Sequence, residues 1–245
     1  MCSHQTRRKR ALIAFMAALA VMVLAACPSK PVKTPQQQAE ELYQQGLRLI
    51  DNRQLTEAIT AWEKAIEIYP QHSGAHFKLG LTYKKVGDMF KEKNDIENAK
   101  KAYSLAIIHY QKVAELTPND PAVHNNLANV FYSLQNYDGA IQGYNKAILL
   151  KPYDPDYHYN LANAYSKKGL IKQAIEHYEE AIRIDPNYFD AYYNLARLYE
   201  KSHDINNAIR YYQEYVNREN RPGEAEWVER ARRKIYKLRG GGAIY

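Results

Sequence analysis

Apolar and small residues recur along most of the chain at a fixed interval of 34 residues. Pro152 and Pro186 lie 34 residues apart, and so do the Leu-Ala pairs that begin at Leu127, Leu161 and Leu195. Within each interval the apolar residues fall three or four positions apart, which is the spacing of one face of an α-helix. A period of this length is typical of stacked helical hairpins, so the pattern predicts an all-α solenoid.

The positions within each period resemble the tetratricopeptide repeat (TPR). That family has a large residue at position 4, Leu at 7, Gly or Ala at 8 and an aromatic at 11. Its second helix has Ala at 20, an aromatic at 24, Ala at 27 and Pro at 32. In the unit 121–154 these are His124, Leu127, Ala128, Phe131, Ala140, Tyr144, Ala147 and Pro152. The resemblance implies a superhelical stack of antiparallel helix pairs, with a concave face lined by the first helix of each pair.

The chain therefore divides into an amino-terminal targeting segment, five repeats and a carboxyl-terminal capping helix. The fifth repeat departs from the pattern at Tyr215 and Asn220, where Ala and Pro are expected. A stripe of Trp227, Ala231, Ile235 and Leu238 then predicts a helix that closes the stack, with basic residues on its opposite face. The predicted units are a signal peptide at 1–26, a tether at 27–38, repeats at 39–72, 73–120, 121–154, 155–188 and 189–222, a capping helix at 223–239 and a tail at 240–245.

The second repeat is longer than the others, because Pro118 closes it 14 residues late. Its second-helix signature occurs twice, offset by seven residues. Seven extra residues in each helix would keep the apolar faces aligned, since seven is close to two helical turns. This predicts a turn at Asn94-Asp95, while a competing register turns at Gly87-Asp88. The hairpin would project about 10 Å beyond its neighbours, as a docking ridge or as a neutral elongation.

The amino terminus has the pattern of a secretion signal. Basic residues precede an apolar run over 11–26, which is too short for a comfortable membrane span. The run ends in Leu24-Ala25-Ala26-Cys27, which resembles the lipobox of bacterial lipoproteins. The resemblance implies cleavage before Cys27 and acylation of its thiol by chains such as palmitate, which would anchor the protein to a membrane. The alternative is an uncleaved membrane anchor with an incidental cysteine.

The residues after the cysteine predict a tether and the membrane to which the protein is sorted. Residues 28–38 contain three prolines, which favour an extended chain that would reach about 35 Å from the bilayer. Pro28 follows the cysteine where an Asp would signal retention in the inner membrane. In a Gram-negative cell the resemblance therefore implies the periplasmic face of the outer membrane.

Net charge and cysteine content argue against a nucleic-acid-binding protein and against a disulfide-stabilised fold. The formal net charge of +7 falls to +3 once the signal peptide is removed, which does not indicate a nucleic-acid partner. The mature chain keeps one cysteine, so it can form no disulfide within itself. The full sequence has 22 Tyr and 5 Phe residues, and large rings with polar tips suit helix surfaces that are partly buried.

Motifs for catalysis or metal binding are missing from the sequence. His76, His124 and His158 all take position 4, one per hairpin, which places them too far apart to share a metal ion. There is no Gly-rich phosphate loop, serine elbow or cysteine nucleophile. The sequence predicts a non-enzymatic protein without a cofactor or a metal site.

The predicted concave face is rich in amides and aromatic rings. A side-chain amide can donate to and accept from a peptide backbone at once, so a ladder of amides suits an extended peptide. The ladder is similar to that in the repeats of O-linked GlcNAc transferases. The carboxylate clamp of chaperone-binding repeats is disfavoured by Asp156 and Asp190 at position 2, so we expect a neutral or mildly basic segment. The predicted binding residues are Asn126, Asn129, Asn160, Asn163, Asn194, Tyr159, Tyr193 and Arg197.

Together these features predict a lipid-anchored scaffold that binds a partner protein or an extended peptide and assists assembly of a bacterial envelope complex. Pilotins are lipoproteins of similar architecture. Two alternatives remain: an accessory subunit of a cell-envelope enzyme, and a self-assembling coat, because open solenoids can associate end to end. The basic face of the capping helix is either solvated or in contact with anionic lipid or an acidic partner.

Overall fold

The computed structural model describes residues 32–219, 221 and 223–241. Every regular element within these ranges is an α-helix, which confirms the all-α solenoid that the 34-residue period predicts. The helices are α2 (Pro35–Asp51), α3 (Leu55–Ile68), α4 (Ser73–Glu92), α5 (Ile96–Leu116), α6 (Pro121–Ser133), α7 (Tyr137–Leu150), α8 (Pro155–Lys168), α9 (Ile171–Ile184), α10 (Phe189–Lys201), α11 (Ile205–Arg218) and α12 (Ala225–Leu238).

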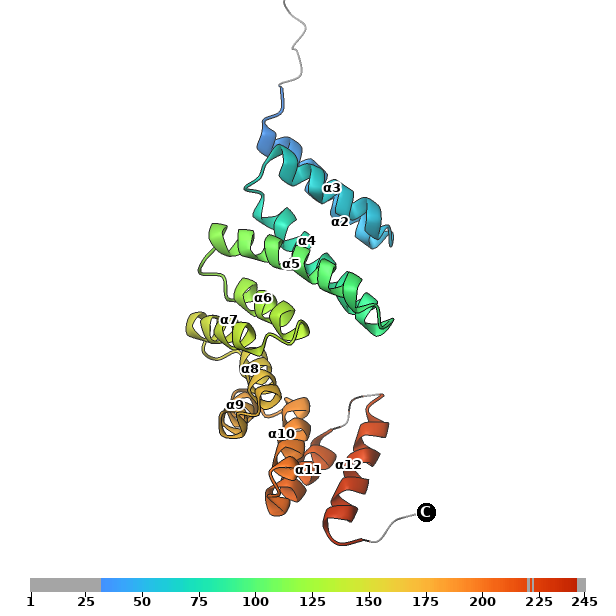
Figure 1. The fold of residues 1–245 in the computed structure, drawn as a ribbon, viewed down its shortest axis with the longest axis vertical. Coiled ribbons are helices and arrows are strands. Elements are labelled where there is room, and N and C mark those ends of the chain that lie inside the picture. Colours follow the sequence, from blue (N-terminus) through green and yellow to red (C-terminus); the bar gives the residue numbers. More distant parts are fainter. Residues whose placement is uncertain (1–31, 220, 222, 242–245) are drawn as a thin grey trace, which may run out of the picture.

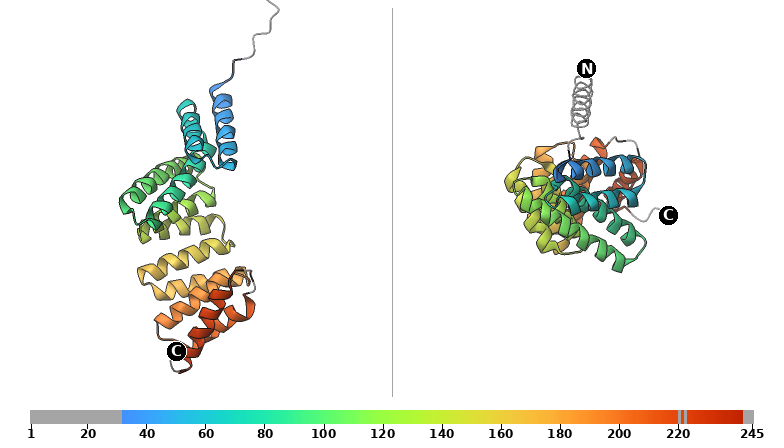
Figure 2. Two further views of the ribbon diagram at one scale, coloured as in Figure 1. Left: turned by 90° about the vertical axis from the view of Figure 1, so that its right-hand side faces the viewer. Right: turned by 90° about the horizontal axis from the view of Figure 1, so that it is seen from above.

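Consecutive helices pair into antiparallel hairpins that stack along the long axis of the molecule. Figure 1 shows the stack running from α2–α3 at one end to α10–α11 and α12 at the other. The second helix of each hairpin packs against the first helix of the next, and α4, α6 and α8 also contact one another in sequence. Seen along the axis, the hairpins wind around a common centre (Figure 2). Each hairpin is therefore buried by its neighbours, as expected for a solenoid.

All five hairpins reverse direction in the same way, including the long one. Each turn contains one residue in the left-handed region of backbone space, which lets the chain leave one helix and enter the next within a few residues. Gly87 and Asp88 lie inside α4, so the competing register does not occur. The left-handed residues are Arg53, Asn94, Gln135, Gly169 and His203, with φ between 59° and 84°.

In the long hairpin a contact between a glycine of α4 and a tyrosine of α5 occurs twice, the second time seven residues nearer the turn. α4 has 20 residues and α5 has 21, whereas the helices of the next hairpin have 13 and 14. A Cβ atom added to Gly80 would lie 2.9 Å from the ring of Tyr110, and one added to Gly87 would lie 2.5 Å from the ring of Tyr103. Glycine is therefore required at both positions, because each tyrosine lies directly on the opposing backbone.

Helix α2 begins earlier than the sequence predicts. The proposed tether extends to Gln38, but the helix starts at Pro35 behind the N-cap Thr34. The amide of Gln37 donates to Thr34 Oγ1 at 3.2 Å, and the amide of Thr34 donates to Gln37 Oε1 at 2.9 Å. This capping box satisfies first-turn amides, and proline is favoured at N1, so the helix absorbs the last residues of the predicted tether. The signal peptide and Cys27 lie outside the described residues.

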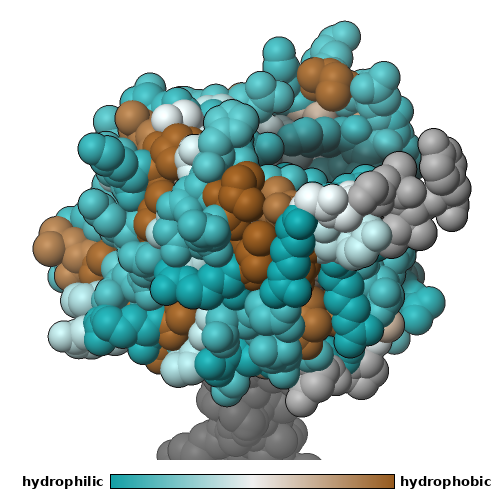
Figure 3. Space-filling view, turned by 90° about the horizontal axis from the view of Figure 1, so that it is seen from below, coloured by the Kyte–Doolittle hydropathy of each residue, from teal (hydrophilic) through white to brown (hydrophobic). Residues whose placement is uncertain are grey.

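Helix α12 closes the far end of the stack. Ala231 and Ile235 are buried against α10 and α11, as the predicted stripe requires. Trp227 differs from that prediction, because 44% of its surface is exposed. This end of the molecule has a mostly hydrophilic surface with separated apolar patches (Figure 3). Across the described ranges, no helix is both long enough and apolar enough to cross a membrane.

Candidate functional site

Three adjoining cavities run along the face formed by the first helices of the later hairpins. The first, of about 350 Å³, lies between α4, α6 and α8; the middle one, of about 290 Å³, lies between α6, α8 and α10. The third, of about 270 Å³, lies between α8, α10 and α12. Tyr132 and Asn163 line both the first and the middle cavity, and Asn194 and Arg197 line both the middle and the third. The cavities therefore form one continuous trough.

The trough contains most of the residues predicted to bind a partner. Asn129, Asn160 and Asn163 line the first cavity, and Tyr159 and Tyr193 line the third. Asn126 is half-buried on α6 but does not line any of the three cavities. The register of 34 residues places equivalent positions of successive hairpins on one face, which is why the predicted set gathers here.

The position-6 asparagines tie neighbouring hairpins together. Asn160 Nδ2 donates to Asn125 Oδ1 at 3.1 Å, and Asn194 Nδ2 donates to the hydroxyl of Tyr159 at 2.7 Å. Each amide still has a second N–H and a carbonyl oxygen with which it can meet a ligand. The ladder thus has a structural role that the sequence pattern does not indicate.

The position-9 asparagines accept hydrogen bonds from buried tyrosines of the second helices. Tyr144 donates its hydroxyl to Asn129 Oδ1 at 2.7 Å, and Tyr178 donates to Asn163 Oδ1 at 2.6 Å. Burial strongly raises the pKa of Tyr178, which keeps its hydroxyl protonated and able to donate. Each Oδ1 therefore has one of its two lone pairs engaged, and the side-chain amide keeps further donor and acceptor capacity for a ligand.

Cations surround the middle cavity. Arg197 lines it with Lys167 and Lys201, which are not among the binding residues predicted from the sequence. Arg197 Nη1 donates to Asn194 Oδ1 at 3.4 Å. The sequence does contain a signal for Lys167 and Lys201, because both take position 13 of consecutive repeats. Position 13 lies seven residues after position 6 and four after position 9, so it shares the helix face that lines the trough. Only the stacking of the hairpins decides that Lys167 and Lys201 reach the same cavity.

The third cavity combines aromatic rings with carboxylates. Tyr193 meets Trp227 and Tyr215 edge to face, with ring centroids 5.4 and 5.2 Å apart. Burial raises the pKa of Tyr215 to about 12, and nearby carboxylates add to the shift. Asp190 lines this cavity, where Arg221 Nη2 contacts it at 3.1 Å. The exposed Trp227 of α12 thus belongs to the wall of the trough.

Two histidine pairs lie away from the trough, at equivalent positions of two hairpins. His76 Nδ1 lies 3.0 Å from His109 Nδ1, and His158 Nδ1 lies 3.1 Å from His177 Nδ1. Burial lowers the pKa of His109 and of His177 to about 4, so both are neutral at pH 7. The position-4 histidines follow from the repeat pattern, whereas their partners on the second helices, His109 and His177, were not predicted from the sequence.

In each pair the position-4 histidine uses both of its ring nitrogens in protein contacts. His76 Nε2 faces the carbonyl oxygen of Pro70 at 3.1 Å, so this nitrogen carries the proton of the neutral ring. His76 Nδ1 then accepts from His109 Nδ1. His124 makes the carbonyl contact to Pro118 at 2.8 Å, but its hairpin has Gly143 where the others carry a second histidine. Among the described residues, no three or more His, Cys, Asp or Glu side chains are grouped to hold a metal ion.

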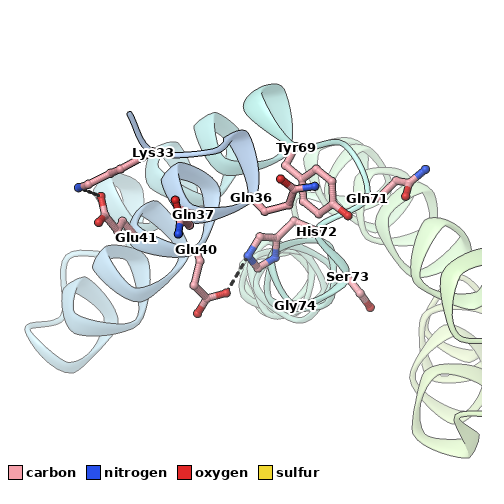
Figure 4. Close-up of a pocket in the computed structure, with 10 residues that line it drawn as sticks. All are labelled: Lys33, Gln36, Gln37, Glu40, Glu41, Tyr69, Gln71, His72, Ser73 and Gly74. Atoms are coloured by element: carbon pink, nitrogen blue, oxygen red, sulfur yellow. Dashed lines mark hydrogen bonds and ion pairs between the residues drawn. The ribbon is translucent and has the colours of Figure 1, made fainter. Parts of the chain in front are cut away.

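A separate cavity of about 870 Å³ lies at the amino-terminal end, between the starts of α2 and α4 (Figure 4). His72 Nε2 lies 3.2 Å from Glu40 Oε2, and His72 Nδ1 accepts from the amide of Ala75 at 3.1 Å. Lys33 is paired with Glu41 at 2.5 Å. None of the predicted binding residues lines this cavity, and its opposite charges are already partnered, so we place the candidate site in the trough.

Family models of repeat proteins match most of the chain. A model described as TPR repeat matches residues 41–87, 87–135, 128–169 and 163–202. A second, described as Tetratricopeptide repeat, matches residues 189–221. A comparison with curated protein sequences gives no match.

Solved structures of repeat proteins share the fold. The crystal structure of MamA is 23% identical with a TM-score of 0.64, over 75% of this chain and 96% of that one. YrrB, described as a TPR protein with an unusual peptide-binding site, is 16% identical with a TM-score of 0.61, over 78% and 90%. PilF of Pseudomonas aeruginosa is 20% identical with a TM-score of 0.58, over 84% and 90%. At these identities the likeness concerns the fold alone.

Proposed function

We propose that this chain, which belongs to the tetratricopeptide repeat family, is a non-catalytic scaffold that binds an extended segment of a partner protein in its trough. The observation that carries the proposal is the continuity of the three cavities, which share their lining residues from α4 to α12. An extended peptide needs a long concave surface with donors and acceptors at regular intervals, and successive hairpins supply these.

The chemistry of the trough supports a peptide rather than a small molecule. Its polar groups are side-chain amides, tyrosine hydroxyls, basic side chains and, in the third cavity, the carboxylates of Asp190 and Glu224, all distributed along its length. None of the three cavities exceeds about 350 Å³. Rigid aromatic rings such as Tyr193 and Trp227 supply contact area at low cost in side-chain entropy. The peptide-binding site described for YrrB is a precedent on the same fold.

We further propose that acylated Cys27 holds the scaffold at a membrane and that the partner belongs to a bacterial envelope assembly. A secretin-like partner would indicate a pilotin-like role, and an enzyme partner would indicate an accessory subunit. Self-crosslinking alone would indicate a coat. These roles rest on the sequence of the amino terminus and on architecture.

Site-specific photocrosslinking in intact cells tests the trough. Photoreactive benzoyl-phenylalanine in place of Tyr132, which lines two of the cavities, should capture a protein of defined mass. The same group in place of Tyr153, which is 75% exposed in the loop between α7 and α8, is the matched control. Capture from Tyr153 but not from Tyr132 would show that the partner binds elsewhere. Mass spectrometry of the product decides among the three roles.

Two sets of substitutions separate binding from anchoring. Asn126→Ala, Asn160→Ala and Asn194→Ala together should abolish capture, with helicity followed by circular dichroism because Asn160 and Asn194 also bridge hairpins. Unchanged capture would remove the amide ladder from the proposal. Cys27→Ser should release the chain from membranes, and continued attachment would mean that the apolar segment itself is the anchor.

A further inference from the structure

The middle cavity of the trough is lined by three positive charges and no negative one. Lys167, Arg197 and Lys201 all contribute to it, and its remaining lining residues are neutral. The neighbouring third cavity is different, because Asp190 and Glu224 line it. Like charges that share a small space repel one another, and this repulsion is relieved when an anionic group enters.

Within the described residues, none of these three cations forms an ion pair with a carboxylate. Over the described residues, no carboxylate oxygen lies within 4 Å of Lys167, Arg197 or Lys201, although ion pairs are common elsewhere on the surface. The contrast is clearest beside the cavity itself. Lys168 follows Lys167 in the chain but points away and pairs with Asp138. The three charges of the middle cavity are therefore available to a ligand.

The helix dipoles explain only part of this charge. Lys167 and Lys201 lie in the last turns of α8 and α10, where basic residues offset the negative end of a helix. Arg197 lies one turn farther in, where the dipole effect has faded. Its contact with Asn194 holds the guanidinium at the border of two cavities. The cluster thus exceeds what the helix ends require.

The aspartates of position 2, which are expected from the sequence to repel a terminal carboxylate, lie outside the middle cavity and have polar partners of their own. Asp156 accepts a hydrogen bond from the hydroxyl of Tyr188 at 2.7 Å, and Asp190 is paired with Arg221. Neither lines the middle cavity. Their charges are partly satisfied and lie toward the start of each first helix, whereas the cations lie toward the end.

We propose that the middle cavity binds the carboxylate of an internal aspartate or glutamate in the segment that occupies the trough. The position of the cavity favours a side chain over a chain end, because the trough continues from it in both directions and the bound chain would pass through. Lysine and arginine donate charge-assisted hydrogen bonds to carboxylates, and these are stronger than neutral ones. The inference rests on the proposed peptide-binding function and adds the chemistry of one subsite.

Selection from a phage-displayed library of random 12-residue peptides, fused through their carboxyl ends, tests this inference. The fusion blocks the chain terminus, so any acidic preference must come from side chains. The full-length protein should enrich peptides with Asp or Glu at one fixed position. The variant Lys167→Glu/Lys201→Glu should lose this enrichment. Lys146→Glu/Lys172→Glu is the control, because both residues are exposed on second helices and carry the same charge change.

A direct measurement follows on one enriched peptide and its Glu→Gln counterpart, by fluorescence polarisation at two salt concentrations. We expect about tenfold weaker binding of the Gln peptide and a difference that shrinks at high salt. Enrichment of peptides without an acidic residue, or equal acid enrichment in all three proteins, would overturn the subsite and leave peptide binding intact. No enrichment above background would reject peptide binding in the trough, and the subsite with it. Thermal melts establish that the variants are folded.

Discussion

The hairpins α4–α5 and α8–α9 differ in length but share one side-chain cluster. His76 and His109 are 33 residues apart in the long hairpin, while His158 and His177 are 19 residues apart in the regular one. The difference equals the 14 residues of the lengthening. In both hairpins the second histidine stacks on a tyrosine of the first helix. The extra residues therefore lie beyond this cluster, at the turn end, and leave the rest of the repeat unchanged.

The turn ends differ in their chemistry. In the regular hairpin the buried Tyr178 donates to the neutral amide of Asn163. In the long one Tyr103 donates to Asp88 Oδ1 at 2.8 Å, and Lys84 Nζ donates to Asp88 Oδ2 at 2.7 Å. The tip also rests on the next hairpin, where Lys91 Nζ donates to the carbonyl oxygen of Ser133 at 3.1 Å. The added heptads therefore extend the packed core and carry an ion pair of their own.

Removal of the buried rings gives the largest expected effect. Tyr103 and Tyr178 are each only 2% exposed, so substitution by Ala should lower the free energy of unfolding by about 3–5 kcal/mol in either hairpin. Urea unfolding followed by circular dichroism measures both, with exposed Ser104→Ala as a neutral control. A cost below about 1 kcal/mol for Tyr103→Ala alone would mean that the tip of the long hairpin opens independently of the core.

Removal of only the hydroxyl groups should separate the two hairpins. Tyr103→Phe should cost about 1–2 kcal/mol, because its partner is a charged acceptor that is partly exposed, whereas Tyr178→Phe should cost about 0.5–1.5 kcal/mol. In an Asp88→Asn background the acceptor becomes a neutral amide, as in the regular hairpin. The cost of Tyr103→Phe should then fall to that of Tyr178→Phe. If it stays the same, the charge of Asp88 does not contribute.

Low pH should destabilise the long and the regular hairpin by the same mechanism, through the buried second histidine of each. The pKa of His109 and His177 falls from 6.5 to about 4 on folding, chiefly because burial disfavours the charged ring. The unfolded chain therefore binds protons at a higher pH than the folded one, and stability present above pH 6.5 is lost as the pH falls toward 4. Each ring should contribute on the order of 1 kcal/mol, reduced by its partial exposure.

Melting temperatures between pH 7.5 and 4 measure this loss. His109→Gln and His177→Gln should each flatten the pH profile, because each removes a buried ring whose charged form is disfavoured by folding. Glu180 raises the pKa of His177 and so works against the effect of burial there. The pH dependence of the melting temperature should therefore depend at least as much on His109 of the long hairpin as on His177 of the regular one. A slope that survives both substitutions would assign acid sensitivity to other groups.

The repeat register predicted much of the fold and part of the trough. Asn160, Asn194, Tyr159 and Tyr193 share positions within the repeat, and equivalent positions of stacked hairpins must lie on one face. The hydrogen bond of Asn163 to Tyr178 could not be predicted in this way, since it depends on how the two helices of a hairpin are rotated against each other. The early start of α2 was missed because proline was taken as a sign of extended chain rather than of a helix N1 position.

The sequence by itself determined the helical period, the glycines and alanines at close contacts, and the length of the added heptads. These are local properties, because the helix has a constant pitch and each residue's face follows from its number. Only the tertiary structure decided which side chains meet across helices. It paired His109 with His76, left Trp227 exposed in the wall of the trough, and brought Lys167, Arg197 and Lys201 around one cavity. Such contacts depend on the angle and spacing between helices, which the packing of all neighbours sets together.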